Sequence, residues 1–222
     1  MVITSRFFIE LYNIISLFSL IYFRNLLYNI VKYVSKSGVS MNINTTYTKI
    51  ITGEDLMETA QHGSTLYPFQ FYYEDLSVFD FNCIEWHWHT ELEFIYIESG
   101  TVTLWIGEDQ FHLTEGNGIF INTKVLHLPL LHPSKPPFPI LYLCLLLLAP
   151  CDSLIYQKYI LPIISSSLPF LVFHKKVCWQ AKVLSIMRQI ISAQDSVLSK
   201  ELLTSSLLQN LWLEIFENTD IS

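Results

Sequence analysis

The clearest alternation of hydrophobic and polar positions in the chain lies between Trp86 and Gly100. Successive side chains of a β-strand point to opposite faces, so one face here takes His87, His89, Glu91, Glu93, Ile95 and Ile97. The opposite face takes Trp86, Trp88, Leu92, Phe94 and Tyr96. A strand face that is polar at one end and aliphatic at the other is typical of the wall of a small barrel with one wet end. Glu98-Ser99-Gly100 then predicts a hairpin turn into a strand from Thr101 to Ile106.

Shorter strand-like and helix-like segments occur along the rest of the chain. Turn residues and alternation predict strands near 67–73, 110–114, 119–122, 125–130 and 140–148, with a turn at 115–118. This density of short strands and Gly or Asn turns indicates an antiparallel barrel or sandwich. Beyond Pro150 the hydrophobic period becomes helical, and we expect a short helix at 152–160, ending near Pro162, and longer helices at 176–193 and 198–216. The predicted fold class is mainly β with C-terminal helices (α+β), a barrel followed by a helix pair.

Residues 1–40 differ in character from the rest. They are rich in Ile, Leu, Phe and Tyr, but their longest clean apolar run, Ile14 to Phe23, is too short to span a bilayer. A signal-like region and an interfacial helix are open interpretations, and our hypothesis is an extension upstream of a natural start at Met41. The expected organisation is a hydrophobic extension over 1–40, a ligand-binding barrel over 41–150 and a helical region over 151–222.

Composition narrows the class of protein. The 222 residues are 51% hydrophobic and 14% aromatic, which is enough for a sizeable core. The net charge of -7, from 13 basic and 20 acidic residues, argues against an exposed nucleic-acid surface, because phosphate binding needs clustered Lys and Arg. The four cysteines include no Cys-x-x-Cys pair. A reducing cytoplasm fits this cysteine usage best.

Four residues form the candidate ligand-binding site, and the same four are candidate metal ligands. His87 and His89 on one strand face lie about 7 Å apart along the chain, which lets both imidazoles converge on one ion. Glu93 follows on the same face, and His127 is the best source of a third imidazole. Three histidines and a carboxylate suit Zn, Fe, Mn or Ni. The plainer interpretation is a hydrogen-bonded polar cluster that lines a pocket without metal, with Glu91 as a partner of one of these groups or of solvent.

The spacing of these residues resembles the two cupin motifs. His87-x-His89-x-x-x-Glu93 followed by Gly100 is similar to the first motif, and Gly116 with His127 is similar to the second. Phe81 stands where the first motif usually opens with Gly, and Asn122 and Lys124 stand at the usual Pro and Gly of the second. The resemblance implies a cupin-like antiparallel barrel or jelly roll.

The stretch from about Tyr67 to Phe216 resembles the sensory half of AraC-type transcriptional regulators. The resemblance rests on Trp-His-Trp-His-Thr-Glu-Leu-Glu from Trp86, on Lys-Tyr-Ile-Leu-Pro from Lys158, and on the segment from Glu201 to Trp212. It implies a cupin domain that binds a small effector, often a sugar, followed by helices that dimerise. In such regulators a C-terminal domain with two helix-turn-helix units follows, so we expect DNA binding only through that domain, which lies outside this sequence.

Competing interpretations accompany these expectations. We expect a sensor and not an enzyme, with no resident cofactor, a divalent metal ion being the alternative. The second function is a stand-alone metal-dependent cupin enzyme of the sugar isomerase or dioxygenase type. Trp86 and Trp88 form either core packing or a sugar-stacking platform. The helices 176–193 and 198–216 form either a homodimer interface or a satellite core against the barrel.

Overall fold

The computed structural model describes residues 50–220 apart from 75, 77–78, 80–82, 132–137, 144–146 and 197. These residues belong to one compact unit, Tyr47–Ser222. The expectations for residues 1–40 lie outside the described residues, as does Phe81. The domain boundaries expected near 40 and 150 stay predictions.

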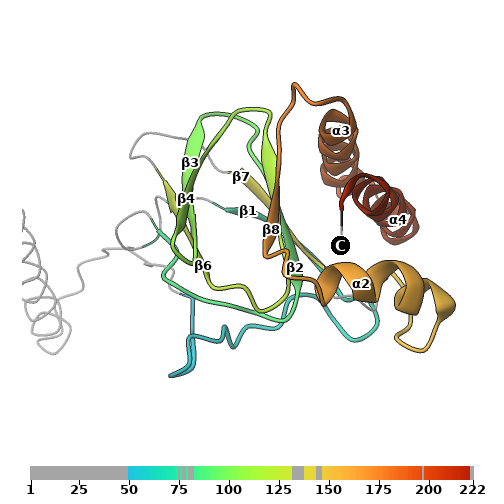
Figure 1. Ribbon diagram of the computed structural model, residues 1–222, viewed down its shortest axis with the longest axis horizontal. Helices are drawn as coiled ribbons and strands as arrows, with labels where there is room; N and C mark the ends of the chain where they lie inside the picture. The colour runs from blue at the N-terminus through green and yellow to red at the C-terminus, as the bar shows by residue number, and fades with distance from the viewer. Residues whose placement is uncertain are drawn as a thin grey trace, which may run out of the picture. The chain divides into compact units, whose positions relative to one another are not determined.

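Within the described residues, eight antiparallel strands form two sheets (Figure 1). The five-stranded sheet has the order β1 (Phe69–Glu74), β7 (Phe138–Leu143), β2 (Leu92–Tyr96), β5 (Gly118–Ile121) and β8 (Phe170–Phe173). The three-stranded sheet has the order β4 (Asp109–Thr114), β3 (Thr101–Ile106) and β6 (His127–Leu131). With helices at the C-terminal end of the chain, this is the mainly β, cupin-like fold with C-terminal helices that the sequence predicted.

The turn at Glu98-Ser99-Gly100 does not close a hairpin, so that prediction is wrong. β2 pairs with β5 and β7 in the larger sheet, whereas β3 pairs with β4 and β6 in the smaller one. The physical reason is that β2 is buried at all five positions, which requires apolar cover on both of its faces. Crossing to the other sheet lets Ile95 and Ile97 pack with Val102 and Leu104 in one core between the sheets.

A second core lies on the outer face of the five-stranded sheet. Phe94 and Phe120 of this sheet pack against buried side chains of α3 (Cys178–Ala193) and α4 (Lys200–Asn218). Figure 1 shows both helices on the side of β8 and β2 that faces away from the smaller sheet. The Nε1–H of Trp212 donates to the carbonyl of Tyr159 at 2.9 Å, which ties α4 to the short π-helix η4 (Tyr156–Ile160). The helical stripes therefore bury much of their apolar surface within the chain.

Two details of the C-terminal region differ from expectation. The helical segment expected at 152–160 continues through α2 (Leu161–Ile164), two residues past Pro162, which lies in the first turn of α2 directly after the π-helix η4. Strand β8 was not predicted from the sequence. It is a four-residue apolar run after Pro169, and it pairs with β5 from Gly118↔Phe173 to Ile121↔Phe170. No helix in the described part of the chain combines the length and the apolar character needed to cross a bilayer.

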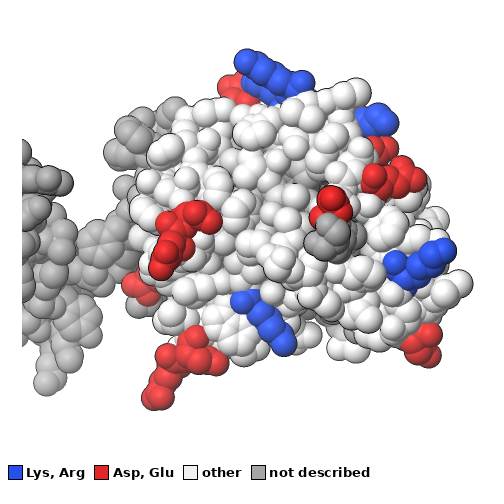
Figure 2. Space-filling view, viewed as in Figure 1, with Lys and Arg blue, Asp and Glu red and all other residues white. Residues whose placement is uncertain are grey.

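The charged side chains do not gather into a basic surface on the face shown in Figure 2. There the described Lys and Arg side chains lie apart from one another, among acidic side chains and a largely uncharged surface. This distribution agrees with the acidic balance of the sequence.

Candidate functional site

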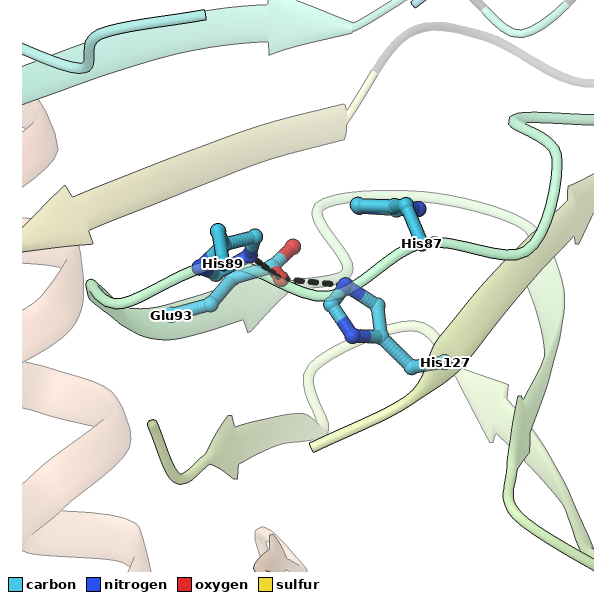
Figure 3. Close-up of side chains that lie close together, drawn as sticks. All are labelled: His87, His89, Glu93 and His127. Atoms are coloured by element: carbon cyan, nitrogen blue, oxygen red, sulfur yellow. Dashed lines mark hydrogen bonds and ion pairs between the residues drawn. The ribbon is translucent and has the colours of Figure 1, made fainter. Parts of the chain in front are cut away.

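The four predicted residues meet between the two sheets (Figure 3). His87 and His89 lie just before β2, Glu93 is on β2, and His127 begins β6. The backbones of His87 and His127 pair directly, with N–O distances of 3.1 and 3.0 Å. One ligand atom from each of the four side chains lies within 4.8 Å of the other three. The structure thus brings together, in a single cluster, residues contributed by both sheets.

The carboxylate of Glu93 is the centre of this cluster. Its Oε2 lies 2.8 Å from Nε2 of His127 and 3.2 Å from Nε2 of His89. All four side chains are almost completely buried, with exposed fractions of 1–2%. A carboxylate withdrawn from water to this degree needs compensating charge or hydrogen bonds, and the two imidazoles supply them.

Backbone carbonyls fix the orientation of all three imidazoles. Nδ1 lies 2.9 Å from the Glu85 oxygen in His87, 3.1 Å from the Glu91 oxygen in His89, and 2.9 Å from the Val125 oxygen in His127. A carbonyl oxygen only accepts, so each Nδ1 carries the proton and donates it. The Nε2 atoms are left to face the interior of the cluster. Histidines that ligate metals are commonly held in this way, through their other ring nitrogen.

Charge in the cluster is concentrated on Glu93 and His127. Burial alone would raise the pKa of Glu93, but the charge on His127 and the contacts with His127 and His89 hold it well below its usual range. Burial alone would lower the pKa of His127, but ionised Glu93 beside it raises the pKa. Burial, assisted by the charge on His127, lowers the pKa of His87 to about 3. Without other ligands the cluster therefore holds a Glu93–His127 ion pair beside a neutral His87.

The donor set fits a divalent metal ion. Nε2 of His127 is buried and lies 2.8 Å from Oε2 of Glu93 as an ion pair, although this approach lacks good hydrogen-bond geometry. A metal ion would take the place of the proton on this Nε2, among three Nε2 atoms and one carboxylate oxygen, and Zn, Fe, Mn and Ni all accept this mixture of ligands. The residues present thus could hold such an ion.

Sequence reasoning missed a second buried pair, Glu58 and His62. Nε2 of His62 lies 3.1 Å from Glu58 Oε2, and its Nδ1 lies 3.3 Å from the hydroxyl of Tyr72. The His62 ring meets the His89 ring edge-on, with centroids 5.8 Å apart. Burial alone would raise the pKa of Glu58, but His62 and the cluster histidines lower it. The only available signal was the i, i+4 spacing of Glu58 and His62, which polar surface segments also show.

A groove of about 360 Å³ reaches the cluster from the surface. It is lined by Gly53, Asp55, Met57, Glu58, Thr59, Ala60, Gln61, His89, Thr90 and Glu91. Glu91, whose side chain is 15% exposed, belongs to this groove and not to the four-residue cluster. The half-buried Trp88 packs on the groove segment, where its Nε1–H donates to the Asp55 carbonyl at 2.9 Å. That contact places the Trp88 ring in packing with the preceding segment.

Residues 70–148 match the family model described as the AraC-like ligand binding domain. The uncharacterized HTH-type transcriptional regulator YdeC of Bacillus subtilis is 27% identical over 144 residues, covering 63% of this chain and 48% of YdeC. The chain thus spans about half the length of this curated relative.

Solved structures give partial overlaps. Apo ToxT from Vibrio cholerae has a TM-score of 0.45 at 10% identity, over 70% of this chain and 58% of its own. An oxalate decarboxylase from Bacillus subtilis has a TM-score of 0.26 at 18% identity, over 28% of this chain and 18% of its own.

Proposed function

We propose, on the premise that this chain carries an AraC-like ligand-binding domain, that it is the effector-sensing region of an AraC-type transcriptional regulator. The observation that carries the proposal is the buried cluster of His87, His89, Glu93 and His127, which lies inside the family match. Burying an ion pair costs several kcal/mol of desolvation, and well-packed apolar residues would stabilise the same space at least as well. A polar cluster kept between two sheets is therefore best explained by recognition of a ligand.

The effector would bind at this cluster and bias the conformations available to the domain. A sugar is the effector class that the family resemblance suggests. The similarity of this chain to YdeC, an HTH-type transcriptional regulator, supports a role in the cytoplasm. There a separate part of such a regulator would bind DNA. In this proposal the 222 residues sense the effector and do not themselves bind DNA.

Dimerisation through the C-terminal helices completes the proposal. The predicted helices 176–193 and 198–216 correspond to α3 and α4, which pack against each other and against the sheet. α4 still exposes Leu202 and Leu213, at 76% and 50%. Exposed leucines on a helix whose other face is buried are suited to a self-complementary interface between two copies.

The test is calorimetric titration of the whole chain with a panel of pentoses, hexoses and divalent metal ions. Glu93→Gln should weaken binding of the effector by about tenfold or more, because it removes the central charge while keeping side-chain volume. Glu108→Gln, in the exposed turn between β3 and β4, is the matched control and should bind normally. Effector binding that is equal in both variants would show that the cluster is not the recognition site.

A second candidate function is a metal-dependent cupin enzyme, of the sugar isomerase or dioxygenase type. It is favoured by the donor set itself, in which the same four residues would hold Zn, Fe, Mn or Ni. A bound ion would supply Lewis-acid polarisation of a substrate oxygen. Conversion of an aldose, or consumption of dioxygen with an organic substrate, by the metal-loaded chain would favour this function over sensing.

A further inference from the structure

The loop that follows β5 joins the candidate site to the helical end of the chain. The Lys124 N–H donates to the His89 carbonyl at 2.8 Å, and the Thr123 hydroxyl donates to the Thr90 carbonyl at 2.9 Å. His89 belongs to the buried cluster and also lines the groove that reaches it. A ligand that displaces His89 therefore also displaces this loop.

Asn122, the first residue of the loop, holds the end of the short helix α2. It is 4% exposed, and its Nδ2 donates to the carbonyls of Ile163 at 3.3 Å and Leu168 at 3.0 Å. Its own N–H donates to the Pro169 carbonyl at 2.9 Å, and its Oδ1 accepts the Thr123 N–H at 2.8 Å. Because a buried polar group without a partner is costly, these bonds specify one arrangement. The position of α2 is therefore fixed relative to the loop.

The helical segment that ends with α2 begins with η4, a π-helix. Its Tyr156 carbonyl accepts the Leu161 N–H, five residues further on. Such turns are rare and occur frequently at functional sites. This one has tertiary support at both ends, from Asn122 beyond α2 and from Trp212 of α4, whose Nε1–H donates to the Tyr159 carbonyl at 2.9 Å. Because packed elements have discrete arrangements, loss of one support changes the turn as a whole.

We infer that η4 and α2 form a switch that carries the state of the buried cluster to α4. A ligand that moves His89 shifts residues 122–124, Asn122 changes its hold on α2, and η4 passes the change to α4 through Trp212. α4 is the helix that carries the proposed dimer interface, so the switch alters the surface offered to a second copy. The inference rests on the proposed sensing function and names its route of regulation. Asn122 and Trp212 are positioning residues, because neither belongs to the cluster.

Amide hydrogen exchange of the whole chain tests this route without an effector. Glu93→Gln serves as the perturbation, because it removes the charge that His89 contacts at 3.2 Å. We expect exchange in residues 156–164 and 207–216 to rise about tenfold relative to exchange in α3, because the π-helical turn loses its fixed support. Unchanged exchange in residues 156–164 would overturn the inference.

Two substitutions break the route at different contacts. The side chain of Asn122→Ser is too short to reach both carbonyls, so adding Glu93→Gln should not raise exchange in residues 156–164 any further. Trp212→Phe keeps a ring but loses the N–H, so Glu93→Gln should still raise exchange in residues 156–164 but no longer in residues 207–216. The Trp212 variant decides the question by itself if the Asn122 variant does not fold. A full response to Glu93→Gln in residues 207–216 of Trp212→Phe would overturn the inference.

Asn117→Ser is the matched control. Asn117 also joins distant segments, because its Oδ1 accepts the Lys175 N–H at 3.1 Å, but it lies in the turn before β5. Glu93→Gln should act in this variant as it does in the native chain, and loss of the response here would overturn the inference. Calorimetric titration with effectors is a separate measurement. Glu93-dependent binding without the exchange response overturns the inference alone, whereas absence of all binding removes the sensing function.

Discussion

Lys124 adopts a backbone conformation that side chains with a β-carbon rarely adopt. Its φ is 61°, and its N–H donates to the His89 carbonyl at 2.8 Å. Position 124 is where the second cupin motif usually has Gly, the residue that adopts positive φ without steric cost. The departure from the motif is therefore a local strain in the loop that precedes His127, and it leaves the site geometry in place.

Lys124→Gly should consequently stabilise the fold by about 1 kcal/mol, because it relieves the left-handed strain at an exposed position. Lys124→Ala is the matched control: it also removes the charged side chain but keeps the β-carbon, so it should give no comparable gain. Urea denaturation monitored by tryptophan fluorescence measures both. Equal stability of the two variants would show that the side chain, and not the backbone, sets the free energy of unfolding here.

Asn122 shows why a motif departure is hard to interpret from sequence alone. It takes the place of the usual Pro and is 4% exposed. Its Nδ2 donates to the carbonyl of Ile163 in α2 at 3.3 Å and to the carbonyl of Leu168, in the loop between α2 and β8, at 3.0 Å. These acceptors are more than 40 residues away in the chain, so no local pattern around Asn122 could predict them.

The faces of strand β2 could be predicted from the sequence, but its partner strands could not. Alternation correctly divided its side chains, with Glu93 and Ile95 facing the space between the sheets and Phe94 facing the helices. The partner strands were not predictable, because alternation states which face is apolar but not what covers it. The assumption that consecutive strands pair therefore failed at Gly100.

Helix α4 divides its leucines between two surfaces. Leu208 and Leu211 are 1% exposed and pack inside the chain, whereas Leu203 is 41% exposed. Leu202 and Leu213 are eleven residues apart, which places them on one helix face about 16 Å apart. The outward surface available to a partner is this second face.

Leu202→Glu with Leu213→Glu should accordingly convert a dimer into a monomer without unfolding the chain, because like charges would meet across a self-complementary interface. Light scattering after size-exclusion chromatography measures the mass. Leu66→Glu with Leu154→Glu, also exposed leucines but on other segments, is the control with the same change in charge and should stay dimeric. An unchanged mass in the α4 variant would place the interface elsewhere.

For the molecule as a whole, the cluster is the polar link between the two sheets. Glu93 belongs to the five-stranded sheet, whereas His127 belongs to the three-stranded sheet and pairs with the backbone of His87. These residues could be predicted because their spacing follows a strand and a known motif. Glu58 and His62 could not be predicted in this way. They reach the cluster through contacts with Trp88 and Tyr72, which join residues that are distant in sequence or whose spacing follows no regular period.

A metal ion in this position should stabilise the whole barrel. An ion bound only by the folded state, present at 100 times its dissociation constant, adds about 2.7 kcal/mol to the free energy of unfolding. For a chain of this size that corresponds to a rise in Tm of about 5–10 °C. Because the ligands join both sheets, the rise should appear as a shift of one transition and not as a separate one.

Two histidine variants decide whether the stabilisation comes from the cluster. His127→Gln removes one ligand from the smaller sheet, so added metal should no longer raise Tm. His112→Gln alters an exposed histidine on β4, whose Nδ1 lies 3.0 Å from the Thr103 hydroxyl, and should leave the metal effect intact. A metal-induced rise that is the same in both variants would mean that the ion binds elsewhere. A rise confined to chains with His127 would mean that one ion holds the two sheets together.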